Sequence, residues 1–372
     1  MFSITLLVNG VVTPIAGSLV DRYNPRWVIS SGICLAGIGL ALCSLATSQW
    51  QFYVFYGVVM AVGLAIAGWI PFAAIISQWF VKRRAFLFGI LAAAFGFSLV
   101  SATFAQVLIS AYGWQMAYVC LGLISIVIIA PLCLLFLRDK PTRNQLLAEN
   151  NVQRKDESVA VLKIAEAWSG TTWTLSRAIK TSRFWLLFLL SFMLLGVVEN
   201  IIVTHQIFFY QDAGYSPLLA ANIYSVYGIS LIIGTFCCSF SDRFGRETVF
   251  IPACLVCAGA TSLLFLLHDT SSILIPVCFA FFFGLGFGAV GPIIFVVASD
   301  LFQGRYYGSI SGTINTGFSL GGIVSPWFAG FLHDKTGNYS LIFIILVVCL
   351  VTSSIAMLLI SPRKIRPISS LA

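Results

Sequence analysis

The sequence predicts an all-α polytopic membrane protein built from two parallel-repeat helical halves, and three observations carry this prediction. Hydrophobic residues make up 59% of the 372 positions and charged residues only 9%. A chain of this composition cannot cover a water-facing surface with its own polar side chains. Eleven apolar runs are near or above the roughly 18 to 20 residues that a helix needs to cross a bilayer. The third observation is an internal repeat.

The repeat is visible in residues that recur at one interval. Asp21 and Asp242 each follow an apolar run and lie 221 positions apart, and Pro71 and Pro292 keep the same separation. The string Gly-Phe-Ser-Leu at 96–99 returns at 317–320. A parallel repeat of this length, made of apolar segments, is typical of secondary transporters.

The eleven apolar runs predict eleven transmembrane helices of a twelve-helix design. In chain order they cover residues 1–20, 27–47, 52–78, 86–111, 114–137, 184–210, 218–241, 249–267, 272–299, 307–332 and 339–360. Shifting the run at 184–210 back by the repeat interval places its counterpart before residue 1. We therefore predict that the first half lacks its opening helix through a misassigned start codon, a truncated sequence or a real loss, and we favour the first of these.

Charge divides the chain into parts. We predict an N-terminal half of five helices at 1–137, a polar cytoplasmic linker at 138–183, a C-terminal half of six helices at 184–361 and a cytoplasmic tail at 362–372. Of the 21 Lys and Arg residues, all but Lys335 fall in alternate connections, in the linker or in the tail. Because Lys and Arg are retained in cytoplasmic loops, these segments are predicted to be cytoplasmic, in a multi-pass protein of a plasma or bacterial inner membrane.

Several function classes are disfavoured by the same residues. The net charge of +8 is spread over separate loops, so no contiguous basic face for nucleic acid is predicted. All ten cysteines lie in apolar runs, and Cys254 and Cys257 have neither a second pair nor a nearby His. We therefore predict neither a metal nor a cofactor. Since no nucleophile and base pair or metal-ligand cluster faces a loop or the membrane interior, we predict that the protein is not an enzyme.

Glu199 and His205 are the two ionisable groups within the predicted spans that titrate near or below neutral pH. A carboxyl group in hydrocarbon is unfavourable unless it has a partner or a task. Burial favours its neutral form, so proton coupling or substrate binding is available to Glu199, with structural hydrogen bonding as the alternative. Helical spacing puts Gln206 on the same face, whereas His205 points away and approaches the outer interface, where it serves the site or anchors the helix.

Other polar residues in the spans complete the set of candidates for substrate binding or proton coupling. Each is more often a packing or interfacial residue than a ligand contact. They are Asn200, Tyr224, Tyr227 and Asn315. The predicted partners are a small-molecule substrate, protons and the lipid bilayer.

An acid and an Arg are adjacent at the ends of two runs, as Asp21-Arg22 and Asp242-Arg243. A carboxylate and a guanidinium at the cytoplasmic mouth can bridge neighbouring helices. We predict that each pair latches one conformation closed. Interfacial anchoring is the alternative, and duplication at equivalent points of the two halves argues against it.

Around these pairs the chain resembles the major facilitator superfamily, over essentially its whole length. Two loop motifs of that family are similar to residues of this chain. They are matched by Gly17, Asp21, Arg22 and Arg26 after the family's second helix, and by Asp242, Arg243, Gly245 and Arg246 after its eighth. Each copy departs from the pattern, since Asn24 and Cys238 stand where the family has Gly. The resemblance implies a major facilitator type of fold, with alternating access about a site between the halves.

A narrower resemblance is to the monocarboxylate transporter and oxalate/formate antiporter group. Its pattern around the fifth helix is similar to residues 79–89 and 112–114, and its second-half pattern is similar to 212–217 and 299–305. This resemblance implies transport of small organic anions, moved with protons or exchanged. Carriers of this group commonly hold the carboxylate with an Arg in the eighth helix, but residues 218–241 contain no cation. A neutral or cationic substrate therefore stays open, and a non-transporting membrane sensor or an inactive carrier remnant is the alternative to transport.

Overall fold

The computed structural model of the chain describes residues 2–80, 83–137, 173–267, 269–270, 272–302, 304 and 306–360. These residues form helices joined by short turns, and no strand occurs among them. The first half contains α1 (Phe2–Arg22), α2 (Pro25–Cys43), α3 (Gln49–Val54), η1 (Phe55–Met60), α4 (Ala61–Ala67), α5 (Trp69–Trp79), α6 (Arg84–Leu123), η2 (Ile124–Ile129) and α7 (Ala130–Phe136). The short α10 (Leu175–Ala178) precedes the second half, which contains α11 (Ser182–Leu190), η3 (Ser191–Glu199), α12 (Asn200–Asp212), α13 (Pro217–Cys237), α14 (Phe240–Phe244), α15 (Arg246–Leu263), η4 (Leu264–Leu266), α16 (Leu274–Leu301), α17 (Tyr307–Thr336) and α18 (Ser340–Ile360).

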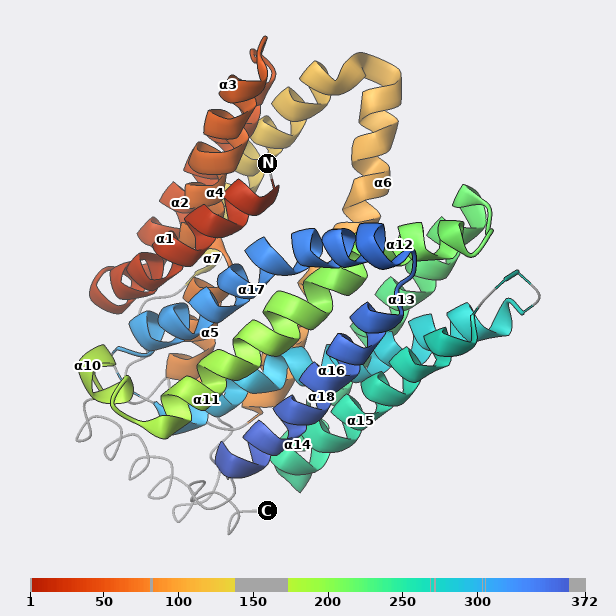
Figure 1. The fold of residues 1–372 in the computed structure, drawn as a ribbon. Helices are drawn as coiled ribbons and strands as arrows, with labels where there is room; N and C mark the ends of the chain where they lie inside the picture. The colour runs from red at the N-terminus through yellow and green to blue at the C-terminus, as the bar shows by residue number, and fades with distance from the viewer. Residues whose placement is uncertain are drawn as a thin grey trace.

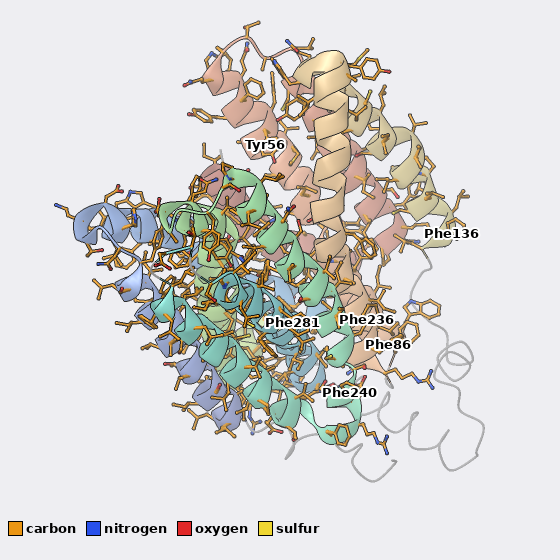
Figure 2. The ribbon with its side chains drawn as sticks, turned by 90° about the vertical axis from the view of Figure 1, so that its right-hand side faces the viewer. Tyr56, Phe86, Phe136, Phe236, Phe240 and Phe281 are labelled. Carbon is orange, nitrogen blue, oxygen red and sulfur yellow. The ribbon has the colours of Figure 1, made fainter. Side chains whose placement is uncertain are left out.

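Nine helical stretches in the described part of the chain are long and apolar enough to cross a membrane. Large apolar side chains project outward, as Phe236, Phe240 and Phe281 do in Figure 2, and such a surface suits contact with lipid. Two further helices align with predicted spans, namely the apolar start of α6 and the Gly- and Ser-rich α17. The prediction of an all-helical polytopic membrane protein is confirmed, while the count of eleven spans and the missing first helix stay predictions.

The bends of the helices have local causes. At Gly113, α6 folds back on itself, and the φ of 81° at this residue lies in the left-handed region that favours glycine. The bend is visible at the top of Figure 1, and it separates the runs predicted at 86–111 and 114–137. Asn24 caps α2 by accepting a hydrogen bond from the backbone N–H of Arg26 at 3.1 Å, with Pro25 at the first helical position.

The two halves meet along α17, which lies between α1 of the first half and α11 of the second half (Figure 1). Glycines allow α17 to approach both of these neighbouring helices closely. Gly308 lies directly against the backbone of Gly17, and a Cβ atom on Gly317 would lie 2.6 Å from the carbonyl oxygen of Phe188. Small residues let helix backbones approach each other within a membrane, and larger side chains at these positions would force the helices apart.

The halves also contact each other through α6 and α13, where Gly89 lies against the carbonyl group of Thr235. One end of the molecule carries Arg22, Arg26, Arg84, Arg243 and Arg246, and we term it the Arg-rich end. The contact of α1 with α17 and the contact of α6 with α13 both extend to this end.

The predicted linker and tail fall mostly on residues that the structure does not describe. Within the described part of the linker, Trp173 packs edge-on against Phe302 with ring centroids 5.2 Å apart. The remainder of the linker, 138–172, and the tail at 362–372 lie outside the described residues. The predicted boundaries of the two halves therefore stay predictions.

Candidate functional site

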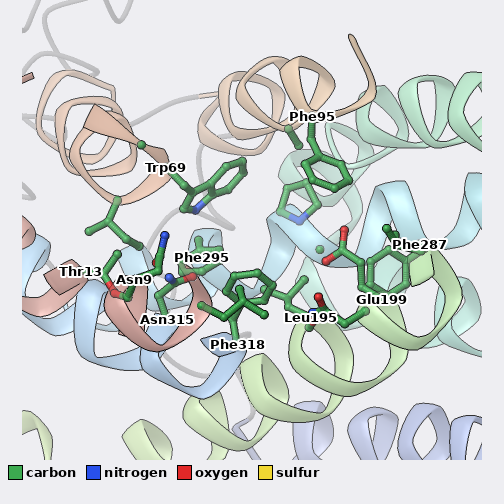
Figure 3. A pocket seen from close by; sticks show the side chains of 18 of the residues that line it. Asn9, Thr13, Trp69, Phe95, Leu195, Glu199, Phe287, Phe295, Asn315 and Phe318 are labelled. Carbon is green, nitrogen blue, oxygen red and sulfur yellow. The ribbon is translucent and has the colours of Figure 1, made fainter. Parts of the chain in front are cut away.

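A cavity of about 420 Å³ lies between the two halves (Figure 3). Its wall is built by α1, α4, α5 and α6 of the first half and by η3, α12, α13, α16 and α17 of the second. Most of the lining side chains are apolar or aromatic. The polar groups belong to Asn9, Thr13, Trp69, Glu199, Asn200, Thr235 and Asn315. Among the described lining residues, Glu199 is the one ionisable side chain.

Five of these polar groups lie at two ends of this cavity. Asn9, Thr13 and Asn315 gather at one end beneath Trp69, whereas Glu199 lies at the other end beside Phe287 (Figure 3). Asn9 and Thr13 are four residues apart on α1, so the same face of that helix presents both. One end of the cavity therefore offers neutral hydrogen-bonding groups, and the other offers a carboxyl group.

Glu199 is positioned by a π-helical segment, η3, that ends at this residue. Asn200, the next residue, donates a hydrogen bond from Nδ2 to the carbonyl oxygen of Leu195 at 2.8 Å. Single π-helical segments inside α-helices occur often at functional sites. The carboxyl group of Glu199 lies near Tyr224 and Tyr227 of α13, and it makes no hydrogen bond within the described residues.

His205 and Gln206 do not line this cavity. His205 lies with Nε2 2.9 Å from the carbonyl oxygen of Pro326, and its ring centroid is 6.1 Å from that of Tyr339. Gln206 donates a hydrogen bond from Nε2 to the hydroxyl of Tyr210 at 2.9 Å. His205 therefore connects α12 to α17, and Gln206 contacts a residue of its own helix.

At the Arg-rich end, Asp21 binds the first turn of α17. Its side chain is 1% exposed, and its carboxylate accepts hydrogen bonds from the backbone N–H groups of Gly308 at 2.9 Å and Ser309 at 2.8 Å. The first N–H groups of a helix have no partner within that helix, and the helix dipole favours negative charge there. Gly17 lies one turn before Asp21, and its contact with Gly308 allows the carboxylate to reach these donors.

The equivalent acid of the second half, Asp242, belongs to a network of ion pairs. It accepts a hydrogen bond from the backbone N–H of Phe86, at the start of α6, at 3.3 Å, and it pairs with Arg246 at 2.8 Å. Arg246 also pairs with Asp300 at 3.0 Å, and Asp300 pairs with Arg84 of the first half at 3.3 Å. The network therefore joins α6 of the first half to α14, α15 and α16 of the second.

Both arginines of this network are held in place within the protein. Arg84 and Arg246 are 1% and 2% exposed. Arg84 also donates to the backbone carbonyl oxygens of Phe80 at 2.6 Å and Ser77 at 2.9 Å, both in its own half. Arg84 is therefore fixed by its own half and pairs with a residue of the other half.

In each predicted latch the acid contacts the opposite half and the neighbouring Arg does not join it, and the latching role stays a prediction. Arg22 and Arg243 are both exposed, and the carboxylates turn toward the opposite half instead. Successive residues of a helix point about 100° apart, so an acid that faces an interface turns its neighbour outward. Gly245, with φ of 102°, lets the chain turn between α14 and α15, which brings Arg246 back to Asp242.

The candidates from the sequence are distributed as follows. Glu199, Asn200 and Asn315 line the cavity, and Tyr224 and Tyr227 lie near Glu199. Their roles stay predictions.

Several residues that the structure places in the cavity wall or in the ion pairs of the Arg-rich end were not among the site residues predicted from the sequence. They include Asn9, Trp69, Arg84 and Asp300. Asn9 had a readable signal, because it is a polar residue inside an apolar run with Thr13 one turn further on. No spacing in the sequence pairs Arg84 with Asp300, since the contact depends on which helices of the two halves meet.

Two helical halves, nine candidate spans within the described residues and a cavity between the halves define the class, a polytopic membrane transporter. The sequence profile described as Major Facilitator Superfamily matches residues 1–326, and the chain belongs to this family. The resemblance stated from the loop motifs is thereby confirmed.

Among known proteins, the chain is similar to monocarboxylate transporters. It is 26% identical over 347 residues to "Monocarboxylate transporter 13" of Rattus norvegicus, covering 92% of this chain and 75% of that protein. It is also 26% identical over 380 residues to "Monocarboxylate transporter 2" of Homo sapiens, covering 96% of this chain and 76% of that protein. These relatives are transporters, in agreement with the prediction that the chain is not an enzyme.

Solved structures with the same fold are transporters too. The proton:xylose symporter XylE, bound to 6-bromo-6-deoxy-D-glucose, superposes with a TM-score of 0.77 at 15% identity, covering 95% of this chain and 84% of that one. FucP in the outward conformation superposes with a TM-score of 0.70 at 16% identity, covering 96% and 88%. At these identities the likeness shows the fold alone.

Proposed function

We propose that the protein is a secondary active transporter that moves a small organic solute, a monocarboxylate or a related organic anion, together with a proton by alternating access. The observation that carries the proposal is the position of Glu199 as the one ionisable side chain among the described residues of the cavity wall. The similarity to monocarboxylate transporters supports the substrate class.

The apolar cavity gives the proposal its physical reason. An anion that enters an apolar site without a cation loses its hydration, and a second negative charge on Glu199 would repel it. When Glu199 carries a proton, the loaded cavity holds one negative charge fewer, so solute and proton bind more favourably together than separately. Glu199 is thus the proton-binding residue of the proposed mechanism.

The contacts of Asp21, Asp300 and Arg84 at the Arg-rich end supply the second part of the mechanism, and we call them the gate. We take the Arg-rich end to be cytoplasmic, on the rule that Lys and Arg are retained on that side. The hydrogen bonds of Asp21 to the start of α17 and the ion pair of Asp300 with Arg84 then hold the cytoplasmic side closed. Opening that side requires both contacts to break while the two halves rock about the cavity.

Proteoliposomes that carry an internal pH dye test the proposal. Lactate, pyruvate, oxalate and formate are added outside vesicles with the wild-type protein, with Glu199→Gln and with Asp334→Asn, which removes a carboxyl group that is 83% exposed. We expect acidification inside with one or more of these acids for the wild type and for Asp334→Asn. Glu199→Gln should give only the signal of protein-free vesicles, because an amide cannot carry the coupled proton.

Counterflow separates symport from the anion exchange that the resemblance also allows. In vesicles preloaded with the transported acid, Glu199→Gln should still exchange labelled acid, because exchange needs no net proton movement. Unchanged proton-driven accumulation in Glu199→Gln would contradict the role of Glu199. Exchange by the wild type with no pH change would replace symport by anion exchange.

A further inference from the structure

Two polar atoms on the cavity wall are buried and have no hydrogen-bond partner among the described residues. They are Oδ1 of Asn9, an acceptor, and Nε1 of Trp69, a donor. Buried polar groups in proteins almost always have partners, and groups without one inside a protein call for an explanation. Both atoms belong to the same end of the cavity (Figure 3).

The position of Trp69 is set by its neighbours. Its ring lies 6.2 Å from that of Phe88 in the first half and 5.4 Å from that of Phe295 in the second, measured between centroids. Packing of this kind fixes the orientation of a side chain and therefore the direction of its N–H group. The unpaired donor is thus a preorganised feature of the wall.

The two halves contact each other at the end of the cavity that holds Asn9 and Trp69. Gly10, next to Asn9, lies against Ser319 of α17, and its carbonyl oxygen accepts a hydrogen bond from the hydroxyl of Thr316 at 3.1 Å. Asn315, which precedes Thr316, reaches the cavity from the second half. A ligand held here contacts both halves at once.

We infer that Asn9 and Trp69, together with Asn315, form a subsite for an uncharged head group that accepts one hydrogen bond and donates one, such as the hydroxyl or the protonated carboxyl group of a small organic acid. This inference rests on the proposed function and adds to it the groups that recognise the substrate. The unpaired indole N–H donates to the head group, and the unpaired amide oxygen accepts from it.

The chemistry of the wall favours an uncharged head group at this end. No Lys, Arg or His occurs among the described lining residues, so a carboxylate would be held by neutral groups alone and would face an unpaired acceptor. The rest of the lining is largely apolar, with Leu231 and Phe287 among its side chains, and it suits a short hydrocarbon chain.

The test measures competition by three acids that differ at one position. Lactate carries a hydroxyl group beside its carboxyl group, pyruvate carries a keto group there, and propionate carries neither. Each competes with labelled substrate in counterflow for the wild type, Trp69→Phe and Asn9→Leu. Trp69→Phe keeps an aromatic ring beside Phe88 and Phe295, and it removes the N–H group together with the five-membered ring of the indole.

Controls are available in the same chain. Trp50→Phe and Asn222→Leu make the same substitutions at exposed positions outside the cavity wall and should leave affinity unchanged. Thermal unfolding of each purified variant identifies any that fails to fold, and Asn9→Ser then replaces Asn9→Leu.

Loss of one neutral hydrogen bond should weaken binding by about three- to tenfold in both cavity variants. A loss for all three acids assigns the subsite to the carboxyl group, and a loss for lactate alone assigns it to the hydroxyl group. Affinities within the error of the controls for both variants would overturn the subsite and leave the proposed transport intact. A wild-type protein that moves none of the acids would contradict the proposed function itself.

Discussion

The two halves are joined at the Arg-rich end once through Asp21 and once through Asp242, and the two contacts use different chemistry although the acids are equivalent in the repeat. Asp21 is bound by two backbone N–H groups of α17. Asp242 is bound by one backbone N–H group of α6 and by Arg246. Arg246 also pairs with Asp300, which in turn pairs with Arg84.

The difference follows from residues that the two copies do not share. At the positions equivalent to Arg246 and Asp300, the first half carries Pro25 and Gln78. The repeat therefore keeps the acid that binds the start of a helix in the opposite half, and only the second half adds buried ion pairs. We infer that the helix contact is the shared element of the gate and that the network is an addition to it.

Removing Asp300 should have the largest effect on the stability of the Arg-rich end. Asp300→Asn leaves Arg84 and Arg246 buried near each other without their shared carboxylate, and breaking a buried pair from one side costs about 3–5 kcal/mol. We expect a lower temperature of unfolding in detergent. Adding Arg84→Gln removes one of the two cations and should recover part of the loss. A single variant as stable as the wild type would show that the network contributes nothing to the closed end.

A methyl group at Gly17 should have the next largest effect, on the side of Asp21. Gly17→Ala places a Cβ atom against the carbonyl group of Gly308, where backbone faces backbone and neither can give way. Overpacking of this kind costs about 1–3 kcal/mol. The matched control is Gly259→Ala in α15, since a Cβ atom there meets nothing within 4 Å. Equal unfolding temperatures for the two variants would contradict the close contact.

The difference between Asp21→Asn and Asp242→Asn should be smaller, and it compares the two contacts directly. In Asp21→Asn the new amide presents N–H groups to backbone donors, so at least one hydrogen bond of Asp21 is lost. In Asp242→Asn the amide can face the more exposed side, since Asp242 is 17% exposed, and Arg246 keeps Asp300. We expect Asp21→Asn to be the more destabilising of the two by about 1 kcal/mol. Parallel unfolding measurements test the difference, and the reverse order would assign the main closure to the network.

Much of the fold could be predicted from the sequence because the residues that recur in the repeat have definite physical roles. The apolar runs, the acid at the end of a run and the Gly at a helix contact each have a local reason to occur where they do. The partners across the halves have no such reason. Asp21 binds residues 287 and 288 positions away, and Arg84 binds one 216 positions away, so these pairs became visible only with the fold.

The candidate site was predictable in part. Glu199 was predicted from charge alone, because an acid in an apolar span is rare and conspicuous. Asn9 and Trp69 carry no charge, and their part in the cavity depends on unpaired atoms that no sequence pattern reveals. His205 is polar and close to Glu199 in the chain, but it points to Pro326 rather than to the cavity.

The glycines of α17 also bear on how the chain enters the membrane. Of the long helices, α17 is absent from the nine that are apolar enough to cross a bilayer unaided, because the small residues that allow it to contact α1 and α11 contribute little hydrophobic surface. We expect insertion of α17 to depend on helices already in the bilayer, so that α1, which is synthesised well before α17, must wait for this partner. A defect at this contact would then reduce the yield of correctly integrated protein, apart from any effect on transport.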